Sequence, residues 1–244
     1  MILNGKTDIG KRRKNNQDSF VIRLWEDIDC ALGVVCDGMG GAKSGNVASQ
    51  LAADVFAQEI KRSFKSDMDQ EAQDRMLRSA VKLANFTVYD QAQQFEEFSG
   101  MGTTLVAVLV TGKNATFVNV GDSRGYHVDR DGVRQITVDH SLVQLMVDKG
   151  ELTPEQAKSY PGKNLITRAI GTEAQVNCDI FHKKLERGDC LLLCSDGLSN
   201  LIDEQEILFE VVHGVDKGKC CQRLLDIVKK RGAPDNVTGI LVVI

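Results

Sequence analysis

Hydrophobic residues are distributed along the chain in two patterns, short apolar runs and longer stretches with helical spacing. The short runs are rich in Val and Leu, which is typical of β-strands. They occupy residues 19–24, 30–36, 103–110, 115–120, 125–128, 133–137, 176–181, 190–194 and 237–244. The sequence therefore predicts a protein built from many short strands.

Two pairs of helices are predicted between these strands. In residues 47–64 and again in 77–88, apolar side chains recur every three or four positions, so that each helix has one apolar face. A second pair covers residues 204–213 and 219–231, just before the last strand. This order does not follow the regular β-α-β alternation of a doubly wound fold. It predicts an α+β sandwich in layers, with antiparallel sheets covered by pairs of helices.

Residues 141–169 depart from this regularity. The segment is polar, weakly periodic, and contains two of the three prolines. Long insertions between the strands of a compact domain are often functional flaps. The chain otherwise contains no repeat, low-complexity tract or Pro/Gly/Ser-rich linker. We therefore expect a single domain over residues 1–244, with a flap around 141–169.

The composition indicates which compartment and which classes of partner to expect. The 244 residues include 30 Lys and Arg against 34 Asp and Glu, a formal net charge of −4, and 42% are hydrophobic. Such a chain can build a core, and it lacks the basic surplus of bulk nucleic-acid binders. It has no apolar run near the ~20 residues of a membrane helix and no signal-peptide core at its start. We expect a cytoplasmic monomer that binds neither nucleic acid nor membrane.

The seven cysteines indicate reduced thiols. Their number is odd and none belongs to a C-x-x-C pair, which argues against a disulfide framework or a zinc site. Phosphoester chemistry at a thiol would require an Arg six residues after the Cys. None of the seven has one, which argues against a thiol nucleophile of that class.

Aspartates stand at the ends of several predicted strands. Asp37, Asp122 and Asp196 each come at the end of an apolar run, and Asp235 lies in the turn before the last strand. A further polar group, residues 8–18, leads into the first strand. Any one Asp-Gly pair can be a plain turn, but repetition at strand ends indicates a common site.

Electrostatics and ligand chemistry indicate what such a cluster of carboxylates can bind. Carboxylates that converge repel one another and have raised pKa values, unless cations hold them together. Ligands that are all oxygen, without His or Cys, suit hard ions such as Mg²⁺ and Mn²⁺. Gly38, directly after Asp37, lets the backbone approach closely enough for its carbonyl to serve as a ligand. The residues alone indicate a di-metal hydrolase.

An ordered set of motifs resembles a known family, the metal-dependent serine/threonine protein phosphatases (PPM, type 2C) in their compact bacterial form. The resemblance runs from Thr7 to the end of the chain. Each motif is weak by itself, but the ordered set is specific. The motifs are Thr7-Asp8-x-Gly10-x-x-Arg13-x-x-Asn16-Gln17-Asp18, Asp37-Gly38-Met39-Gly40-Gly41, Gly102-Thr103-Thr104, Gly121-Asp122-Ser123-Arg124, Asp139-His140-Ser141, Ser195-Asp196-Gly197-Leu198 and Asp235-Asn236-Val237-Thr238.

The resemblance implies a fold and a metal centre. The family's fold is an α+β, four-layer αββα sandwich, two antiparallel sheets flanked by pairs of antiparallel helices. By resemblance, Asp37 bridges two metal ions and Gly38 lends its carbonyl to one of them. Asp196 and Asp235 ligate the other metal, and Asp122 with Asp196 resembles the third site of bacterial members. The expected cofactors are two or three Mn²⁺ or Mg²⁺.

The resemblance also implies the reaction. Asp18 is expected to hold metal-bound water, and Arg13 to bind the substrate phosphate with its planar guanidinium. Together with Asp37 they form the expected catalytic set. Two divalent ions that share a water lower its pKa, and the resulting hydroxide attacks phosphorus without a phosphoenzyme. The implied substrates are phosphoserine and phosphothreonine in proteins, themselves substrates of a serine/threonine kinase in bacterial signal transduction.

Some positions depart from the family pattern. Met39 stands where many eukaryotic members have a His proposed to protonate the leaving alcohol, and a thioether donates no proton. Ala42 and Asn46 offer no replacement acid, and Gln17 stands where many relatives have Glu. His140, beside Asp and Ser, is interpreted as bracing its loop.

Three alternative functions have some support in the sequence. Residues 129–133 fit the D-x-D-x-[TV] motif of haloacid-dehalogenase-type phosphatases, but the preceding run is mixed and Asp131-Gly132 favours a hairpin turn. Residues 40–44 fail the phosphate-loop pattern, because Ala42 and Asp37 occupy its glycine positions. A catalytically weak phosphoprotein-binding module of the same fold would be expected to lose metal aspartates, and none is missing.

The basic run Lys11-Arg12-Arg13-Lys14 has two interpretations. It could be a nucleic-acid patch. In an otherwise acidic chain, attraction of a phosphorylated substrate is favoured, with Arg13 the residue that touches it.

Overall fold

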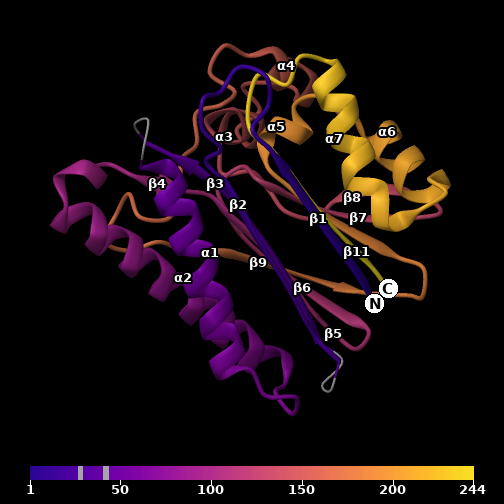
Figure 1. Cartoon of the computed structure of the whole chain (residues 1–244), viewed down its shortest axis with the longest axis horizontal. Coiled ribbons are helices and arrows are strands. Elements are labelled where there is room, and N and C mark those ends of the chain that lie inside the picture. Colours follow the sequence, from indigo (N-terminus) through magenta and orange to yellow (C-terminus); the bar gives the residue numbers. More distant parts are fainter. Residues whose placement is uncertain (27–29, 41–43) are drawn as a thin grey trace.

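A computed structural model describes residues 1–26, 30–40 and 44–244. Two antiparallel sheets form its centre (Figure 1). The first has the strand order β1-β11-β10-β7-β8, and the second has the order β2-β3-β5-β6-β9, with β4 paired to the end of β3. The strands are β1 Ile2–Asp8, β2 Asp18–Trp25, β3 Cys30–Met39, β4 Gly102–Thr103, β5 Leu105–Thr111, β6 Asn114–Val120, β7 Arg124–Asp129, β8 Gly132–Gln135, β9 Asp179–Lys184, β10 Cys190–Cys194 and β11 Val237–Val243.

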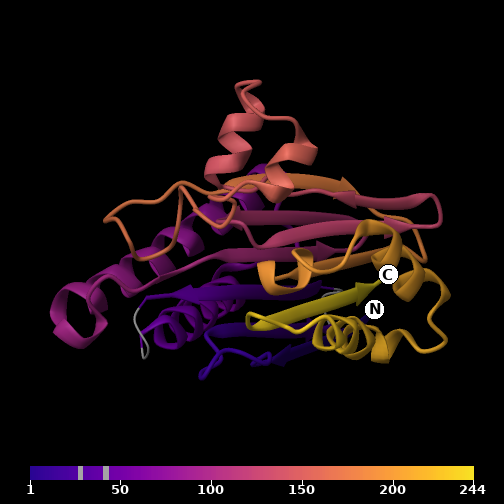
Figure 2. The same cartoon turned by 90° about the horizontal axis from the view of Figure 1, so that it is seen from above.

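Helices cover the outer face of each sheet (Figures 1 and 2). The long helices α1 Gly45–Ser63 and α2 Gln70–Gln94 pack on the second sheet. The first sheet is covered by α6 Glu204–Leu208, which continues into a π-helical turn at Phe209–His213, and by α7 Cys220–Lys230. The remaining short helices are α3 Leu142–Asp148, α4 Pro154–Ser159, α5 Asp196–Ser199 and the 3₁₀ turns Glu96–Phe98 and Lys217–Lys219. The predicted four-layer αββα sandwich is confirmed.

Three layers of apolar side chains hold the sandwich together. One lies between α1, α2 and the second sheet, and another between α6, α7 and the first sheet. The middle layer joins the two sheets through side chains such as Val35, Val106, Phe117, Leu193 and Ile240. Alternate residues of each central strand therefore serve two different cores, which explains why β3, β5 and β10 are apolar throughout.

Two sequence predictions about strands were wrong. The first strand of the chain is β1, which the pattern missed because ILNGKTD mixes polar and apolar residues at the edge of its sheet. It pairs along its whole length with β11. The strand expected at 176–181 is instead β9, which begins only at Asp179, because residues 171–178 form a loop.

The 141–169 segment contains two short helices that its weak periodicity did not indicate. Ser141 caps α3, since its side chain accepts a hydrogen bond from the Gln144 amide. Thr153 and Gln156 form a capping box at the start of α4, with Pro154 at its first turn. The segment projects from the sandwich (Figure 2).

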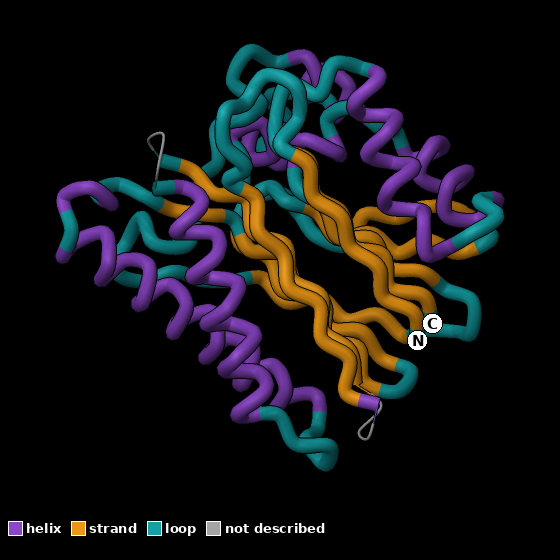
Figure 3. Tube along the Cα trace, viewed as in Figure 1, coloured by secondary structure: helices purple, strands orange, loops and turns teal. Residues whose placement is uncertain are grey.

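At one end of the sandwich, loops from both sheets come together (Figure 3). At that end β2 begins, β3, β6 and β10 end, and the turn before β11 lies. Among the helices of the described residues, none combines the length and apolar character needed to cross a membrane.

Candidate metal centre

The strand ends bring five aspartates to the same end of the sandwich. Asp18 starts β2 and lies opposite Asp37 of β3 in the ladder, while Asp122 follows β6 of the second sheet, Asp196 follows β10 of the first, and Asp235 precedes β11. The arrangement follows from antiparallel pairing, since strands that run in opposite directions place an end and a start side by side. The five residues that the sequence analysis singled out are therefore neighbours in space.

Asp37 lies at the electrostatic centre of this group. Loss of solvation raises its pKa well above the usual range, and the charges of Asp18, Asp196, Asp122 and Asp235 raise it further. The pKa of Asp196 is also raised by burial and by Asp235, although a hydrogen bond with Asp37 opposes the shift. Carboxyl groups that destabilise one another's charged forms in this way have a strong affinity for cations.

The backbone around Asp37 is fixed by hydroxyl groups. Its amide donates to Thr104 Oγ1 at 2.9 Å, and that hydroxyl shares a buried hydrogen bond of 2.7 Å with Ser123. Its carbonyl accepts from the Thr104 amide and from Thr103 Oγ1, both at 2.9 Å. The Gly102-Thr103-Thr104 motif thus holds the Asp37 backbone in place.

Gly38 is required by the close packing of two backbone segments. A Cβ atom at this position would lie 2.0 Å from the carbonyl oxygen of Gly45 at the start of α1. The Gly38 amide donates to the carbonyl of Gln17 at 3.0 Å, which joins β3 to the loop before β2. Gln17 therefore contributes its backbone to the frame of the site.

Asp18 is buried, and its two carboxylate oxygens differ in their hydrogen bonds. Its Oδ2 accepts hydrogen bonds from Ser195 Oγ at 2.8 Å and from Thr238 Oγ1 at 2.7 Å. Its Oδ1 is buried and has no hydrogen-bond partner among the described residues. Burial, opposed by the two hydroxyls and assisted by Asp196 and Asp235, raises the pKa of Asp18 to about 6. Ser195 and Thr238 lie within recognised motifs, but only the structure shows that they hold Asp18.

Arg13 contacts the same group from the loop before β2. Its Nη2 donates to Asp235 Oδ2 at 2.7 Å, and this hydrogen bond raises the pKa of the guanidinium. About half of the Arg13 side chain stays exposed, at 49% relative accessibility, so its other donors face solvent. An arginine held in this way can bind an incoming anion beside the carboxylates.

Asn236 ties the Arg13 loop to the rest of the site. Its Nδ2 donates to the carbonyls of Ile9 and Asn15, and its Oδ1 accepts from the Gln17 amide at 2.9 Å. Gly10 in the same loop has φ of +79°, and a Cβ there would lie 2.1 Å from the Asp235 carbonyl oxygen. Sequence reasoning placed Asn236 in a turn and missed this function, which depends on contacts more than 200 residues apart in the chain.

Asp122 and its loop are held by His140. The His140 Nδ1 accepts from the Gly121 amide at 2.9 Å, and the His140 amide donates to the Gly121 carbonyl. On its other side, His140 Nε2 lies 3.1 Å from Asp179 Oδ2. Burial lowers the pKa of His140, so the neutral ring braces the loop, in agreement with the sequence interpretation. Burial and the charges of Asp196 and Asp139 raise the pKa of Asp122 to about 7.

The donor set fits hard divalent cations. It offers carboxylate oxygens and a backbone carbonyl, raised pKa values, and the unpaired buried Oδ1 of Asp18. Among the described residues, no group of three Asp, Glu, His or Cys side chains is arranged so that it could hold a metal ion. Asp235 is paired with Arg13, and the hydroxyls of Ser195 and Thr238 occupy one oxygen of Asp18 and leave the other for a water.

The structure disfavours two of the alternative chemistries. Asp129, the nucleophile that a dehalogenase-type site would need, accepts hydrogen bonds from the amides of Asp131 and Gly132 in the β7–β8 turn. All seven cysteines are free and buried, and burial raises the pKa of six of the thiols, for example to about 12 for Cys194. Residues 41–43 of the failed phosphate-loop pattern lie outside the described residues.

Comparison with known proteins gives three kinds of match. The family model described as protein phosphatase 2C matches residues 7–228. A serine/threonine phosphatase, stp, from Listeria innocua is 34% identical over 237 residues, covering 97% of this chain and 93% of the relative. The crystal structure of the serine/threonine phosphatase Stp1 from Staphylococcus aureus has a TM-score of 0.90 at 38% identity, covering 99% of this chain and 94% of the other.

A further solved structure contains metal. It is the catalytic domain of the serine threonine protein phosphatase PstP in complex with two manganese ions. Its TM-score to this chain is 0.83 at 34% identity, and the match covers 98% of this chain and 96% of the other. The similarity thus extends over both sheets and over every strand end that carries an aspartate of the site.

Proposed function

The chain belongs to the protein phosphatase 2C family, and from this premise we propose that it hydrolyses phosphoserine and phosphothreonine in proteins. It is a metal-dependent serine/threonine phosphatase that uses Mn²⁺ or Mg²⁺. One observation carries the assignment to particular residues. Five aspartates lie together beside the half-exposed guanidinium of Arg13, and the pKa values of Asp18, Asp37, Asp122 and Asp196 among them are raised.

The ligand assignment follows the position of each carboxylate. Asp37, which interacts with all the others, is the residue best placed to bridge two ions, with the Gly38 carbonyl next to it. Asp196 and Asp235 complete the second ion's ligands, and Asp122 with Asp196 supports a third ion. The raised pKa values of Asp122 and Asp196 favour replacement of a proton by a cation. At Asp235, a cation can replace the guanidinium of Arg13.

Held by these residues, two divalent ions would lower the pKa of a shared water and so supply hydroxide as the nucleophile near neutral pH. Arg13 binds the phosphoryl oxygens with the donors that Asp235 leaves free and neutralises charge that builds on them. Asp18 is held in one rotamer by Ser195 and Thr238, and its unpaired Oδ1 accepts a hydrogen bond from water in the site. Met39 supplies no proton to the leaving alcohol.

The partners and the compartment follow from the substrate class. We infer that the whole chain acts as one phosphatase domain in which residues 141–169 form a flap. Phosphorylated proteins that a serine/threonine kinase produces are the inferred substrates, and the enzyme is inferred to be a cytoplasmic monomer without nucleic-acid or membrane partners. The excess of 34 acidic over 30 basic residues supports the exclusion of nucleic acid.

The function is tested by phosphate release from p-nitrophenyl phosphate and from a phosphothreonine peptide. Turnover of both substrates should require Mn²⁺ or Mg²⁺ and should stop in excess EDTA. Full activity in EDTA would contradict the proposal. Tight binding of the phosphopeptide without phosphate release, in the presence of Mn²⁺, would instead support the alternative of a phosphoprotein-binding module.

A further inference from the structure

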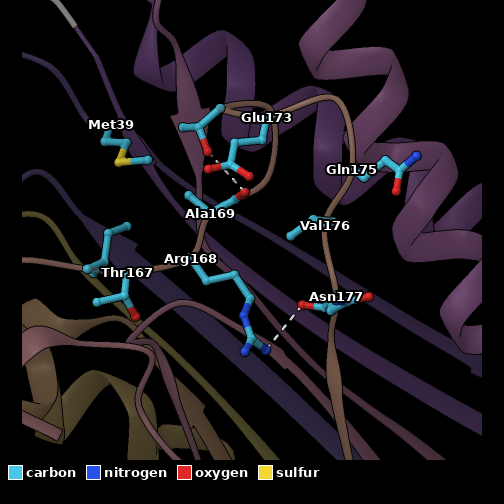
Figure 4. A pocket seen from close by; sticks show the side chains of 10 residues that line it. Met39, Thr167, Arg168, Ala169, Glu173, Gln175, Val176 and Asn177 are labelled. Carbon is cyan, nitrogen blue, oxygen red and sulfur yellow. Dashed lines mark hydrogen bonds between the residues drawn. The ribbon is translucent and has the colours of Figure 1, made fainter. Parts of the chain in front are cut away.

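A cleft of about 480 Å³ lies beside the metal centre. It is lined by Met39 at the end of β3 and by the segment 166–177, and we call it the Met39 cleft. Figure 4 shows Met39 and Thr167 on one side, Val176 and Asn177 on the other, and Glu173 near one end. Its volume lies within the range of sites that bind small ligands or several peptide groups, about 300–1,000 Å³.

The cleft is continuous with the site. Met39 is two residues from Asp37 along an extended strand, a separation of about 7 Å. Met39 pairs with Gly102 of β4, and a Cβ at Gly102 would lie 2.8 Å from Thr172 and 2.9 Å from the Met39 methyl group. The 166–177 segment is joined to β4 by the Ile170–Thr103 bridge, and β4 pairs with the end of the strand that carries Asp37, so the cleft borders the site.

The walls of the cleft are fixed before any ligand binds. Asn85 of α2 is buried, accepts from the Gly171 amide at 2.8 Å, and donates to the carbonyls of Glu173 and Ala174. At the other end, Arg168 Nη1 donates to the Asn177 carbonyl at 3.2 Å. Such a wall loses little conformational entropy when it binds a ligand.

The charges in the cleft are unequal. Arg168 is balanced by Asp179, whose Oδ1 lies 2.9 Å from the Arg168 Nη1. The Glu173 side chain is exposed, and within the described ranges it makes no ion pair or hydrogen bond. The remaining lining is apolar or neutral, including Met39 and Val176. The cleft therefore presents one uncompensated negative charge on a partly apolar surface.

We propose that the Met39 cleft binds the polypeptide that flanks the phosphorylated residue, and that Glu173 selects a Lys or Arg within about three positions of it. The proposal rests on the proposed phosphatase function. An extended chain advances about 3.3 Å per residue, so a side chain two or three positions away reaches the cleft while the phosphate lies at Arg13 and Asp37. The basic side chain would place its stem on Met39 or Val176 and its charge at Glu173.

The test compares phosphothreonine peptides that differ at one position. Lys, Ala or Glu is placed at each of the three positions before and after the phosphothreonine, and kcat and KM are measured for the wild type, Glu173→Gln and Glu173→Lys. At one or two positions the wild type should prefer Lys through KM, by roughly two- to fivefold over Ala. Glu173→Gln should abolish this preference, and Glu173→Lys should reverse it toward Glu.

Two controls separate this proposal from the function on which it rests. Glu186→Lys makes the same charge change in the exposed turn between β9 and β10, at the opposite end of the sandwich, and should keep the wild-type preference. All variants should hydrolyse p-nitrophenyl phosphate at the wild-type rate, since this substrate has no flanking chain. An unchanged peptide preference in both Glu173 variants would overturn the proposal while the function stands. Absence of turnover with every substrate in Mn²⁺ would overturn the function itself.

Discussion

The two ends of the sandwich carry aspartates in similar sequence contexts but in opposite physical states. At the far end, Asp129 accepts two amide hydrogen bonds at 2.8 and 3.0 Å, and these with His127 outweigh a slight loss of solvation and lower its pKa. Asp189 at the same end accepts a hydrogen bond of 2.8 Å from His127. At the other end, Asp18, Asp37 and Asp122 have raised pKa values.

The difference shows what separates a turn from a site. Asp129 begins a D-x-D-G motif and Asp37 a D-G motif, so the local sequence is a poor guide to either function. The turn aspartate finds its donors within three residues of itself. The site aspartates face other carboxylates that belong to distant strands, and the hydrogen bonds to Asp18 and Asp196 do not outweigh burial and this repulsion. Carboxylates that are electrostatically unfavourable in the metal-free protein therefore mark the end of the sandwich that binds cations.

The largest expected effect comes from replacing one aspartate at each end. Asp37→Asn should lower kcat by about a thousandfold or more, because it removes the charge best placed to bridge two ions. The variant should remain folded, and in EDTA its melting temperature should equal or exceed that of the wild type, since a repulsive charge is gone. Asp129→Asn should keep at least half of the wild-type activity. A loss in Asp129→Asn comparable to that in Asp37→Asn would revive the dehalogenase-type alternative.

The second prediction concerns stability in the absence of metal. The folded-state pKa values of Asp18 and Asp122, about 6 and about 7, lie above the ordinary value of 3.8. Their protonation therefore stabilises the fold fully below about pH 4, and this contribution is lost as the pH rises through 6 and 7. In EDTA, the free energy of unfolding should fall by about 2–4 kcal/mol between pH 5 and pH 8.

Denaturant unfolding at a series of pH values measures this trend, with Mn²⁺ and Asp122→Asn as comparisons. Saturating Mn²⁺ should remove the fall, because cations replace the protons, and Asp122→Asn in EDTA should reduce it. Metal-free stability that stays level or rises from pH 5 to pH 8 would show that the fold does not raise the pKa values of these carboxyl groups.

A smaller effect is expected at Arg13, which connects the carboxylates to the substrate. Arg13→Ala should lower kcat/KM for a phosphopeptide by about 10- to 100-fold, because the phosphoryl oxygens lose a charged donor. Arg13→Lys should recover part of the loss, since a lysine keeps the charge but not the planar fork. Mn²⁺ affinity should not weaken in either variant, because Asp235 is freed from its ion pair. Equal kcat/KM in wild type and Arg13→Ala would exclude a substrate contact.

The smallest effect is expected from the other charges of the basic run. The triple variant Lys11→Ala, Arg12→Ala, Lys14→Ala should raise KM for an acidic phosphopeptide by roughly two- to fivefold at low salt. The difference from the wild type should disappear at high salt, because these exposed charges act over a distance. An unchanged KM at every salt concentration would remove the basic run from substrate attraction.

Much of the fold and the identity of the site aspartates were predictable, because they depend on local patterns. Apolar runs of five to eight residues mark the central strands, and the aspartates stand at their ends. Edge strand β1 was not predicted, since a strand that is only partly buried shows little apolar alternation. The start of β9 was misplaced by three residues because Val176 belongs to the cleft wall instead.

The supporting residues of the site could not be predicted, since they act across long separations in the chain. Asn85 holds the loop at Gly171, 86 residues away, and Asn236 holds the loop at Ile9, 227 residues away. Thr238 reaches Asp18 across 220 residues. The local sequence does not distinguish these polar residues from others that make no structural hydrogen bond. Only the tertiary contacts show which of them support the site.

The most direct test of the account is a calorimetric titration of EDTA-stripped protein with Mn²⁺ at pH 7.5. The wild type and Asp129→Asn should each bind two or three Mn²⁺ per chain with the same affinities. Asp37→Asn should lose at least one of these sites, and its remaining affinity should be weaker. Fewer than two Mn²⁺ bound to the wild type, or wild-type binding by Asp37→Asn, would contradict the claim that this end of the sandwich is a divalent-cation centre.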